Sequence, residues 1–285
     1  MKIRSCCGAV FAVLLALAGS GCFKHREAPV RPVTAKGLAE AVSLKETVQE
    51  IDLTGPSSLV EVPDVLVEMP KLETLHLRGS RGIKNFSAFA RMPGLKRLDL
   101  SETGLAAVPA ELLKLTSLEH LYLEGNSLKG IPGGIGGLRA LTYLNLDRNV
   151  IAEMPPELAQ LENLRWLRLN NNQLTALPDG VKGLAKLQRI YLRSNKLERI
   201  PECLNGLPLL EDLSLSDNPI AEIPQWLTGL PKLRRLDLDR SKVTKLPDDL
   251  SGWVGLQELS MARCQVSNDE KFRIRKALPK THVMF

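Results

Sequence analysis

Aromatic residues are scarce in this sequence, with 6 Phe, 3 Trp and 3 Tyr among 285 residues. Most of the apolar content comes from leucine, which supplies 53 residues and nearly a fifth of the chain. Reliance on one branched side chain is untypical of the varied core of a compact enzyme. A mean hydropathy of -0.06 and 25% charged residues exclude a polytopic membrane protein. The 18 Pro and 21 Gly are too few for a collagen-like or low-complexity chain.

Motifs of common catalytic sites are also absent. The sequence contains no CxxC, HExxH, GxxxxGK[ST] or GxSxG pattern. This removes the usual indications of zinc, nucleotide and serine-hydrolase chemistry. We therefore predict a protein that is not an enzyme and that needs no cofactor or metal.

The first 21 residues predict an export signal. Lys2 and Arg4 precede an apolar run over residues 9–18, and small residues follow at positions 19–21. The run is shorter than the roughly 20 apolar residues that a membrane-spanning helix needs. We expect residues 1–21 to be a signal peptide that is removed.

Cys22 follows this signal at once. The stretch LAGSGC over residues 17–22 resembles the lipobox of bacterial lipoproteins, in which the cysteine becomes the lipidated first residue. The resemblance implies a lipid anchor on Cys22 in the bacterial cell envelope, and Phe23 in place of Asp favours the outer membrane. The lipobox position that is usually aliphatic is Gly19 here. The alternative is therefore a plain cleaved signal and a soluble periplasmic or secreted protein.

Removal of the signal leaves 36 basic and 32 acidic residues, a net charge of +4. Nucleic-acid-binding proteins concentrate positive charge in patches, so this small excess does not predict such a partner. Residues 22–36 contain Pro29 and Pro32 and show no apolar periodicity. They are predicted to be a tether between the membrane and the folded part.

Leucines recur through the rest of the chain with a fixed period. Nine of them lie 23 residues apart, namely Leu72, Leu95, Leu118, Leu141, Leu164, Leu187, Leu210, Leu233 and Leu256. Each begins the pattern LxxLxLxxN, which continues with an apolar residue and LPxxLxxL. The clearest unit, residues 164–186, reads LRWLRLNNNQLTALPDGVKGLAK. Such a period is the signature of a repeat architecture. The pattern resembles the leucine-rich repeat, in a form similar to the plant-intracellular Ras-group type that is also common in bacteria.

The repeat predicts an α/β leucine-rich repeat solenoid shaped as a curved horseshoe. Alternation in LxL sends two leucines inward and the residues between them outward on one face of a short strand. Neighbouring repeats then pair as a parallel sheet on the concave side. A recurring proline precedes apolar residues spaced three apart, which predicts short 3-10 or helical segments on the convex side. These segments are wider than the ~4.8 Å strand spacing, so the stack curves.

About ten repeats occupy residues 48–265, beginning with the degenerate unit VQEIDL at 48–53. Leu38 and Val42 are spaced as on a helix and predict an N-terminal cap over residues 37–47. Residues 266–285 carry Phe272, Ile274 and Leu278 among charged residues and predict a C-terminal cap that ends in a short strand. Such caps cover the open ends of the stack. No residues remain for a second domain, and we expect a monomer.

Asparagine occupies the turn after the strand in five central repeats. Its side-chain amide can satisfy backbone groups freed at the bend, as the asparagine ladder of the repeat family does. We assign this structural role to Asn126, Asn149, Asn172, Asn195 and Asn218. Cys203 and Cys264 lie in different registers, too far apart for a disulfide. Both are predicted to be buried thiols.

All three tyrosines fall at the third and fifth places of the repeats, which point outward from the strands. With Trp166 they predict one aromatic patch across four adjacent strands, flanked by arginines on one side and by Glu124 and Asp147 on another. Tyr, Trp and Arg dominate the energetics of protein interfaces. The predicted ligand-binding residues of the concave face are His120, Tyr122, Tyr143, Trp166, Arg168, Arg189, Tyr191 and Arg193. The alternative is that the rings only stabilise the sheet by stacking across strands.

These features predict a non-enzymatic protein-binding scaffold or adaptor of the bacterial envelope. His76, Asp99 and Ser101 lie on neighbouring strands, but an open strand surface offers no desolvated pocket for catalysis. Arg235 and Asp237 illustrate the mixed charge elsewhere on the face, which disfavours a nucleic acid. Glycan or peptidoglycan binding through the aromatic residues is the main alternative. A structural lipoprotein without a specific ligand and a secreted effector are the others. The repeat framework does not encode the partner's identity.

Overall fold

The computed structural model describes residues 32–55 and 59–285. The predicted signal peptide, Cys22 and most of the predicted tether lie outside the described residues. The fold below is that of the unit Pro32–Phe285.

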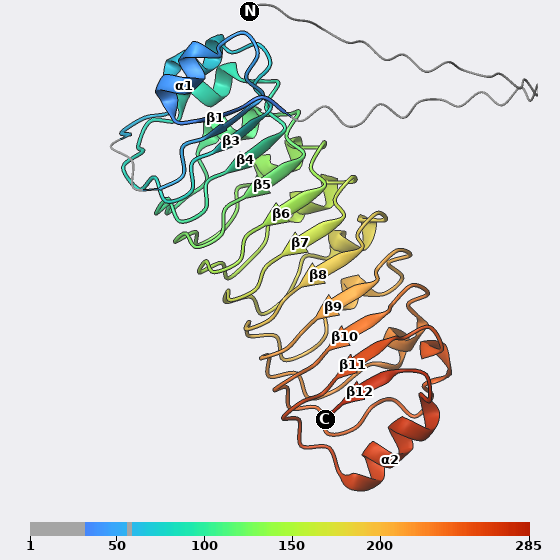
Figure 1. Ribbon diagram of the computed structural model, residues 1–285. Coiled ribbons are helices and arrows are strands. Elements are labelled where there is room, and N and C mark those ends of the chain that lie inside the picture. The colour runs from blue at the N-terminus through green and yellow to red at the C-terminus, as the bar shows by residue number, and fades with distance from the viewer. Residues whose placement is uncertain (1–31, 56–58) are drawn as a thin grey trace, which may run out of the picture. The chain divides into compact units, whose positions relative to one another are not determined.

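Each repeat contributes one three-residue strand to a parallel sheet (Figure 1). The twelve strands of the described residues pair in chain order from β1 to β12. They are β1 Thr34–Lys36, β2 Glu50–Asp52, β3 Thr74–His76, β4 Arg97–Asp99, β5 His120–Tyr122, β6 Tyr143–Asn145, β7 Trp166–Arg168, β8 Arg189–Tyr191, β9 Asp212–Ser214, β10 Arg235–Asp237, β11 Glu258–Ser260 and β12 His282–Met284. The predicted parallel sheet is confirmed, with one strand more at each end than the repeats supply.

The pairing register follows the period of the sequence. Leu144 of β6 pairs with Leu167 of β7, which pairs in turn with Ile190 of β8. The central residue of each of these strands is fully buried, and its two neighbours point to the other face. Equivalent side chains of successive repeats therefore stack in columns across the sheet.

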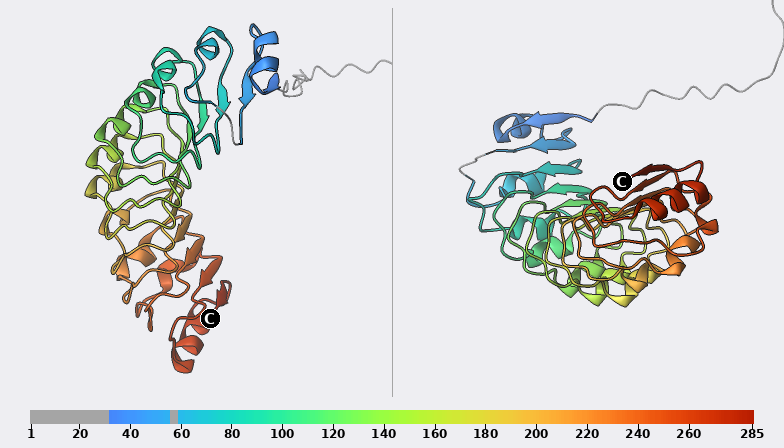
Figure 2. Two further views of the ribbon diagram at one scale, coloured as in Figure 1. Left: turned by 90° about the vertical axis from the view of Figure 1, so that its left-hand side faces the viewer. Right: turned by 90° about the horizontal axis from the view of Figure 1, so that it is seen from below.

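The return path of each repeat carries a short helical segment. The 3-10 helices are η1 Asp64–Glu68, η2 Ser87–Arg91, η3 Ala110–Lys114, η4 Gly133–Gly137, η5 Pro156–Gln160, η6 Asp179–Gly183, η7 Glu202–Leu204, η8 Gln225–Gly229 and η9 Ser251–Trp253. A proline such as Pro109 or Pro178 precedes most of them, because its fixed φ suits the start of such a turn. Figure 2 shows these segments on the outer side of an arc and the strands on its inner side. The predicted concave and convex faces are confirmed.

Leucines of the repeats fill the space between the two sides. In the repeat that begins at Leu164, the side chains of Leu164, Leu167, Leu169 and Leu174 have no exposed surface. The same pattern continues from repeat to repeat as one hydrophobic core. Burying leucine at this density is the main favourable term for a stack whose repeats contact only their neighbours.

The N-terminal end differs in two details from the sequence expectation. Strand β1 lies inside the stretch predicted to be a tether, since Thr34–Lys36 pairs with β2 and Ala35 is fully buried. Helix α1, Leu38–Ser43, follows and turns Ala41 toward the core, while Val42 is 47% exposed. The small alanine lets this short helix lie close to the sheet, so Val42 does not form the inner face as expected.

The C-terminal end is covered by helix α2, Asn268–Ala277, and strand β12. Ser267 accepts a hydrogen bond from the Glu270 amide and so caps α2. Ile274 and Leu278 are buried, whereas Phe272 is 71% exposed. Val283 pairs with Leu259 of β11, so a final short strand is present.

Candidate functional site: the concave strand face

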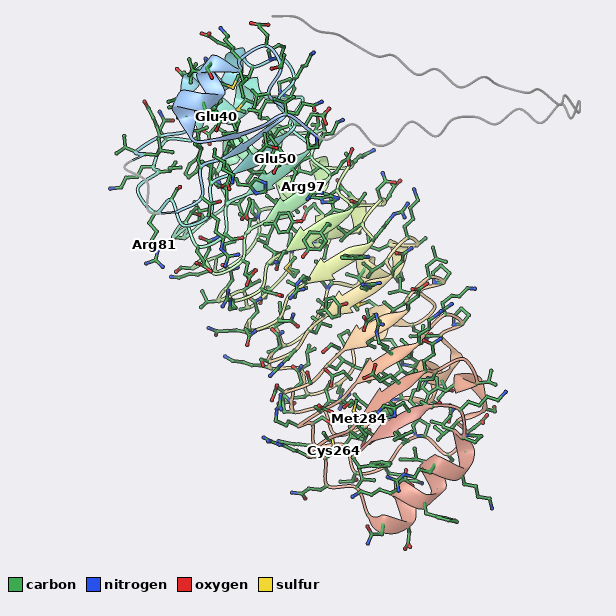
Figure 3. The ribbon with its side chains drawn as sticks, viewed as in Figure 1. Glu40, Glu50, Arg81, Arg97, Cys264 and Met284 are labelled. Atoms are coloured by element: carbon green, nitrogen blue, oxygen red, sulfur yellow. The ribbon has the colours of Figure 1, made fainter. Side chains whose placement is uncertain are left out.

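The outward strand positions form a continuous surface because the pairing register places equivalent residues of neighbouring strands side by side. Tyr143 pairs with Trp166, and Trp166 with Arg189, so the three side chains are adjacent in one column. Figure 3 shows this face along its length, with side chains projecting from the strands between Glu50 and Arg97 at one end and Met284 at the other.

Four ring-bearing residues lie together on β5, β6 and β7, and three of them each contact the fourth, Tyr143. We call His120, Tyr122, Tyr143 and Trp166 the aromatic stripe. Ring centroids of Tyr122 and Tyr143 lie 4.9 Å apart, and those of Tyr143 and Trp166 lie 5.7 Å apart. His120 completes the stripe at 5.9 Å from Tyr143. All these pairs are tilted, a geometry that aromatic quadrupoles favour.

Tyr143 is the centre of the stripe and touches the other three rings. Burial raises the pKa of its hydroxyl to about 12, so it stays protonated at neutral pH. Burial also lowers the pKa of His120, and the nearby charge of Arg97 acts in the same direction. The Nδ1 atom of His120 is buried and has no hydrogen-bond partner within the described part of the chain. The stripe is therefore an uncharged surface.

Arginines continue the surface beyond Trp166. The Arg189 guanidinium lies 4.4 Å from the centre of the Trp166 ring, and that of Arg168 lies 5.5 Å from the centre of the Tyr191 ring. Both are cation–π contacts. In the described residues no ring-to-ring contact joins Tyr191 to Trp166. Tyr191 therefore belongs to the predicted patch through arginine rather than through stacking.

A hollow of about 410 Å³ lies beside the stripe on the same face. We call it the charged hollow, and its lining includes Tyr191, Arg193, Asp212, Arg235, Asp237 and Glu258. Asp212 accepts hydrogen bonds from the Tyr191 hydroxyl at 2.9 Å and from Arg235 at 2.7 Å. The sequence did not predict this hollow, although most of these residues occupy the same outward places of the repeats as the tyrosines.

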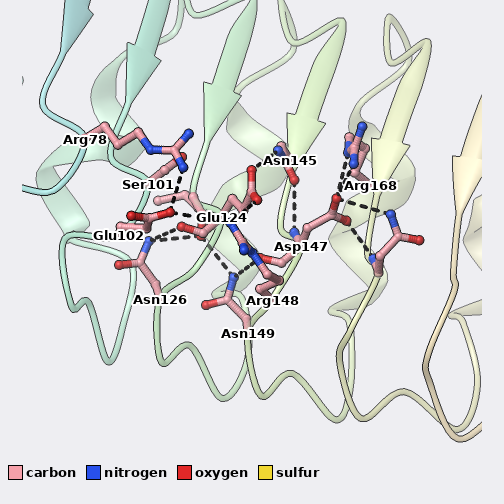
Figure 4. A network of polar contacts seen from close by, with 12 residues as sticks. Arg78, Ser101, Glu102, Glu124, Asn126, Asn145, Asp147, Arg148, Asn149 and Arg168 are labelled. Carbon is pink, nitrogen blue, oxygen red and sulfur yellow. Dashed lines mark hydrogen bonds and ion pairs between the residues drawn. The ribbon is translucent and has the colours of Figure 1, made fainter. Parts of the chain in front are cut away.

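The arginines near the stripe are held by carboxylates. Arg168 contacts Asp147 at 2.6 Å, and Arg193 contacts Asp217 at 2.9 Å. Figure 4 shows Asp147 within a wider network, in which Arg148 also binds Glu124 at 2.7 Å. The sequence predicted basic and acidic residues on opposite sides of the patch, and the structure interleaves them as ion pairs instead. Long arginine side chains reach carboxylates on neighbouring strands because the strands are closely spaced.

The asparagines at the turn after each strand hold neighbouring repeats together. Asn149 donates from Nδ2 to the Leu123 and Leu146 carbonyls at 3.0 and 3.1 Å, and its Oδ1 accepts from the Leu128 amide at 3.0 Å. The same three contacts recur, shifted by one repeat each time, at Asn126, Asn172, Asn195 and Asn218. Figure 4 shows two of these residues below the strand face. They fix the strand ends and so the spacing of the concave columns.

Neither thiol of the described residues is part of the concave surface. Cys203 is buried, and burial raises its pKa to about 11, so it is a protonated thiol. Cys264 takes the asparagine place in its repeat, and its Sγ donates to the Leu238 carbonyl at 3.2 Å. Its side chain is partly exposed, in contrast to the full burial expected from the sequence. Small polar groups can thus replace asparagine near the end of the ladder.

No group of three or more His, Cys, Asp or Glu residues in the described part is placed to hold a metal ion. Nor does any helix in residues 32–55 and 59–285 have the length and apolarity to cross a membrane.

A parallel sheet of stacked leucine repeats with 3-10 helices on its outer side defines a leucine-rich repeat solenoid. Residues 93–151 and 162–220 match the family profile "Leucine rich repeat". Residues 208–252 match the profile "Leucine Rich repeats (2 copies)". The matches cover just over half of the chain, which belongs to the leucine-rich repeat family. Proteins of this family are typically binding scaffolds and are generally not enzymes. No curated protein sequence matches the chain.

The fold is shared with 511 solved protein chains. A leucine-rich repeat protein of Leptospira interrogans is 29% identical, with a TM-score of 0.61, over 88% of this chain and 75% of its own. The internalin InlF of Listeria monocytogenes is 21% identical, with a TM-score of 0.72, over 87% of this chain and 70% of its own. The ectodomain of the Arabidopsis thaliana receptor kinase GASSHO1/SCHENGEN3, in complex with CASPARIAN STRIP INTEGRITY FACTOR 2, is 23% identical, with a TM-score of 0.63. That match covers 88% of this chain and 37% of the ectodomain.

Proposed function

We propose that this protein is a scaffold of the bacterial envelope that binds a protein partner on its concave face, around Tyr143 and Trp166. The aromatic stripe carries this proposal, because it joins four ring-bearing side chains across three strands and ends in a tryptophan that is 36% exposed. Partly exposed Tyr and Trp beside Arg is the composition of interface hot spots. The predicted residues Arg168, Arg189, Tyr191 and Arg193 extend the surface toward the C-terminal repeats.

The geometry of Trp166 favours a protein over a glycan. A sugar stacks on the open face of an aromatic ring, and Trp166 has Tyr143 on one side at 5.7 Å and Arg189 on the other at 4.4 Å. The Arg189 guanidinium over the ring leaves less of the indole face open to a sugar. A guanidinium suits the carbonyl and carboxylate groups of a polypeptide better than a pyranose face. Glycan binding remains the outcome of the test that would displace this proposal.

The partner can be captured through the stripe itself. A photo-crosslinking amino acid at Tyr122, placed in the full-length chain in intact envelopes, should trap the partner for identification. The purified partner should then lose at least about 30-fold in affinity when Tyr143 and Trp166 are replaced by alanine, which corresponds to ~2 kcal/mol. Phe272→Ala is a matched control, since Phe272 is a more exposed aromatic residue on α2.

Equal affinity of the double variant and the unchanged protein would refute the role of the stripe. Binding to a glycan array or to sedimented cell wall that depends on the same two side chains would instead support the glycan alternative. A trapped partner whose affinity depends only on residues of the convex face would place the interface elsewhere.

We also propose that the chain is exported and anchored through a lipid on Cys22, with the outer membrane as its destination. The apolar segment over residues 9–18 and the lipobox-like stretch before Cys22 support this. Cys22→Ser or inhibition of the lipoprotein signal peptidase should release the protein from the membrane fraction, while Cys264→Ser should not. Unchanged partitioning of the Cys22→Ser chain would contradict the anchor. The released chain should sediment as a monomer.

A further inference from the structure

We propose that the charged hollow receives a lysine or arginine side chain of the same polypeptide segment that contacts the aromatic stripe. This inference rests on the proposed protein binding at the concave face and specifies the chemistry of the partner. It predicts that the bound segment has an apolar or aromatic side chain on the stripe and a basic side chain in the hollow.

The charge balance of the hollow is the first argument. Three carboxylates that line it form no ion pair among the described residues, namely those of Asp237, Asp239 and Glu258. Asp237 accepts hydrogen bonds from Ser214 at 2.8 Å and from the Asp239 amide at 3.1 Å, both of which are uncharged donors. The Glu258 side chain makes no hydrogen bond or ion pair in the described part, although Arg235 on the neighbouring strand interacts with it at longer range. The hollow thus presents negative charge to a ligand.

Each arginine that lines the hollow is already paired with a carboxylate, and Asp217 is shared between Arg193 and Arg240. Arg235 donates twice to Asp212, at 3.1 and 2.7 Å. Arg168 and Arg193 are held by Asp147 and Asp217, at 2.6 and 2.9 Å. An anionic ligand would have to break these pairs and would still meet the three free carboxylates. A cationic group would be attracted to these carboxylates without breaking an existing ion pair. Charge complementarity therefore favours a basic partner.

The shape of the hollow suits a long side chain. A volume of about 410 Å³ lies near the lower end of the range of roughly 300–1,000 Å³ found for ligand pockets. It has room for one extended side chain but not for a folded element. Tyr191 and Met284 line it together with the carboxylates. Lysine and arginine carry an apolar stem below a charged head, so they match a wall of this mixed character.

The sheet geometry sets the spacing between the two features. Asp237 and Glu258 lie on β10 and β11, three and four strands beyond Trp166 on β7. At ~4.8 Å per strand this distance is roughly 14–19 Å. An extended chain advances ~3.3 Å per residue, so the basic residue should lie about four to six positions from the apolar anchor.

A peptide library displayed on phage and selected on the immobilised full-length chain tests this inference. Selected sequences should combine an aromatic or aliphatic residue with Lys or Arg about four to six positions away. A selected peptide should lose about tenfold in affinity when its basic residue is replaced by glutamate, because like charges would then face each other. Enrichment of acidic residues, or of apolar residues alone, would overturn the inference.

Charge reversal on the protein makes the test specific to the hollow. Glu258→Lys should weaken binding of the basic peptide by about fivefold or more and improve binding of its glutamate variant. The change breaks no side-chain hydrogen bond or ion pair of the described residues, since the Glu258 carboxylate makes none. Asp248→Lys is the matched control, because Asp248 is an exposed carboxylate outside the hollow and should leave both affinities unchanged. Equal responses of the two variants would overturn the inference.

The outcomes also separate this inference from the proposed function. Peptides that lose affinity on Trp166→Ala but ignore Glu258→Lys would leave the stripe as a binding site and refute the basic side chain in the hollow. Selection of no peptide sensitive to either change would count against both proposals. Sensitivity to both changes, with coupling between Glu258 and the basic residue in a double-mutant cycle, is the expected result.

Discussion

Two tryptophans show how differently the two sides of this solenoid use the same side chain. Trp253 on η9 is 1% exposed, and its Nε1 donates to the Leu227 carbonyl at 3.1 Å. Trp166 on β7 is 36% exposed, and its ring contacts the side chains of Tyr143 and Arg189 on the concave face. The interior side chains hold one repeat against the next, whereas the concave side chains lie on a sheet that is already complete. Changes inside should therefore cost stability, and changes on the concave face should cost binding.

The two tryptophans give the largest expected contrast. Trp253→Ala should lower the free energy of unfolding by about 3–5 kcal/mol, because it leaves a cavity in the core and removes one of the two hydrogen bonds to the Leu227 carbonyl. Trp166→Ala should lower it by about 1 kcal/mol, the value of its ring and cation–π contacts. Urea unfolding followed by circular dichroism measures both. Equal losses would mean that the concave rings are part of the framework and would favour the view that they only stabilise the sheet.

The asparagine turn provides a second contrast between inside and outside. Asn172→Ala removes hydrogen bonds to the Ile151 amide and to the Leu146 and Leu169 carbonyls, at 3.0–3.1 Å. The amide and the two carbonyls left without this partner are buried, so the free energy of unfolding should fall by about 3 kcal/mol.

Asn205→Ala is the control for this change. Asn205 is exposed and donates only to the Glu202 side chain, so its replacement should cost less than about 0.5 kcal/mol. A small loss for Asn172 in the same unfolding assay would show that water replaces the ladder contacts.

Glycine packing between convex segments is expected to have a smaller effect. A Cβ atom on Gly252 would lie 2.2 Å from the Thr228 carbonyl oxygen, so Gly252→Ala must push two repeats apart and should cost about 1–3 kcal/mol. Gly229 occupies the equivalent place one repeat earlier, and no heavy atom lies within 4 Å of its added Cβ. Gly229→Ala should be neutral or slightly stabilising. Similar melting temperatures for the two variants would contradict this difference.

Most of the fold follows from the sequence because the leucine period repeats a single structural unit. Eight intervals of 23 residues fix the register, the burial of Leu167 and its equivalents, and the side on which the strands lie. The irregular ends are less predictable. Strand β1 has only Ala35 to bury, a signal too weak to separate it from a tether. In α1 the choice between Ala41 and Val42 depends on how closely the helix approaches the sheet.

The sequence predicts the site only where the stacking of equivalent outward strand positions determines it. Alternation places Tyr143 and Trp166 on the outward face and next to each other, and the structure shows the expected contact. The partners of arginine do not follow, because a long side chain can reach several carboxylates and its conformation decides between them. Arg189 lies over Trp166, while Arg168 binds Asp147. The shape of the charged hollow also depends on the conformations of long side chains, so the sequence did not predict it.

The C-terminal cap should contribute a modest pH dependence of stability through Glu270. Hydrogen bonds from Arg273 and from the Leu246 amide lower the pKa of Glu270. The folded state therefore favours its carboxylate, and this stabilisation is present above the unfolded pKa of about 4.3 and is lost as pH falls below it. Glu270→Gln should be less stable than the unchanged protein at pH 7, and the two should converge near pH 3. Parallel unfolding curves from pH 7 to 3 would contradict the role of Glu270.

The smallest expected effect concerns backbone strain, which recurs in every repeat. The residue before each ladder position has a positive φ, and in many repeats it is not glycine, as at Ser194 with φ 55°. A non-glycine residue pays a steric cost there, so Ser194→Gly should raise the free energy of unfolding by up to about 1 kcal/mol, and Ser194→Val should lower it. Ser117→Gly is the control, because the φ of Ser117 is not positive and added chain freedom should slightly destabilise it. If Ser194→Gly destabilised the chain as Ser117→Gly does, the left-handed turn would carry no strain. Since Ser194 lies outside the strands, neither change should alter the affinity of a ligand on the concave face.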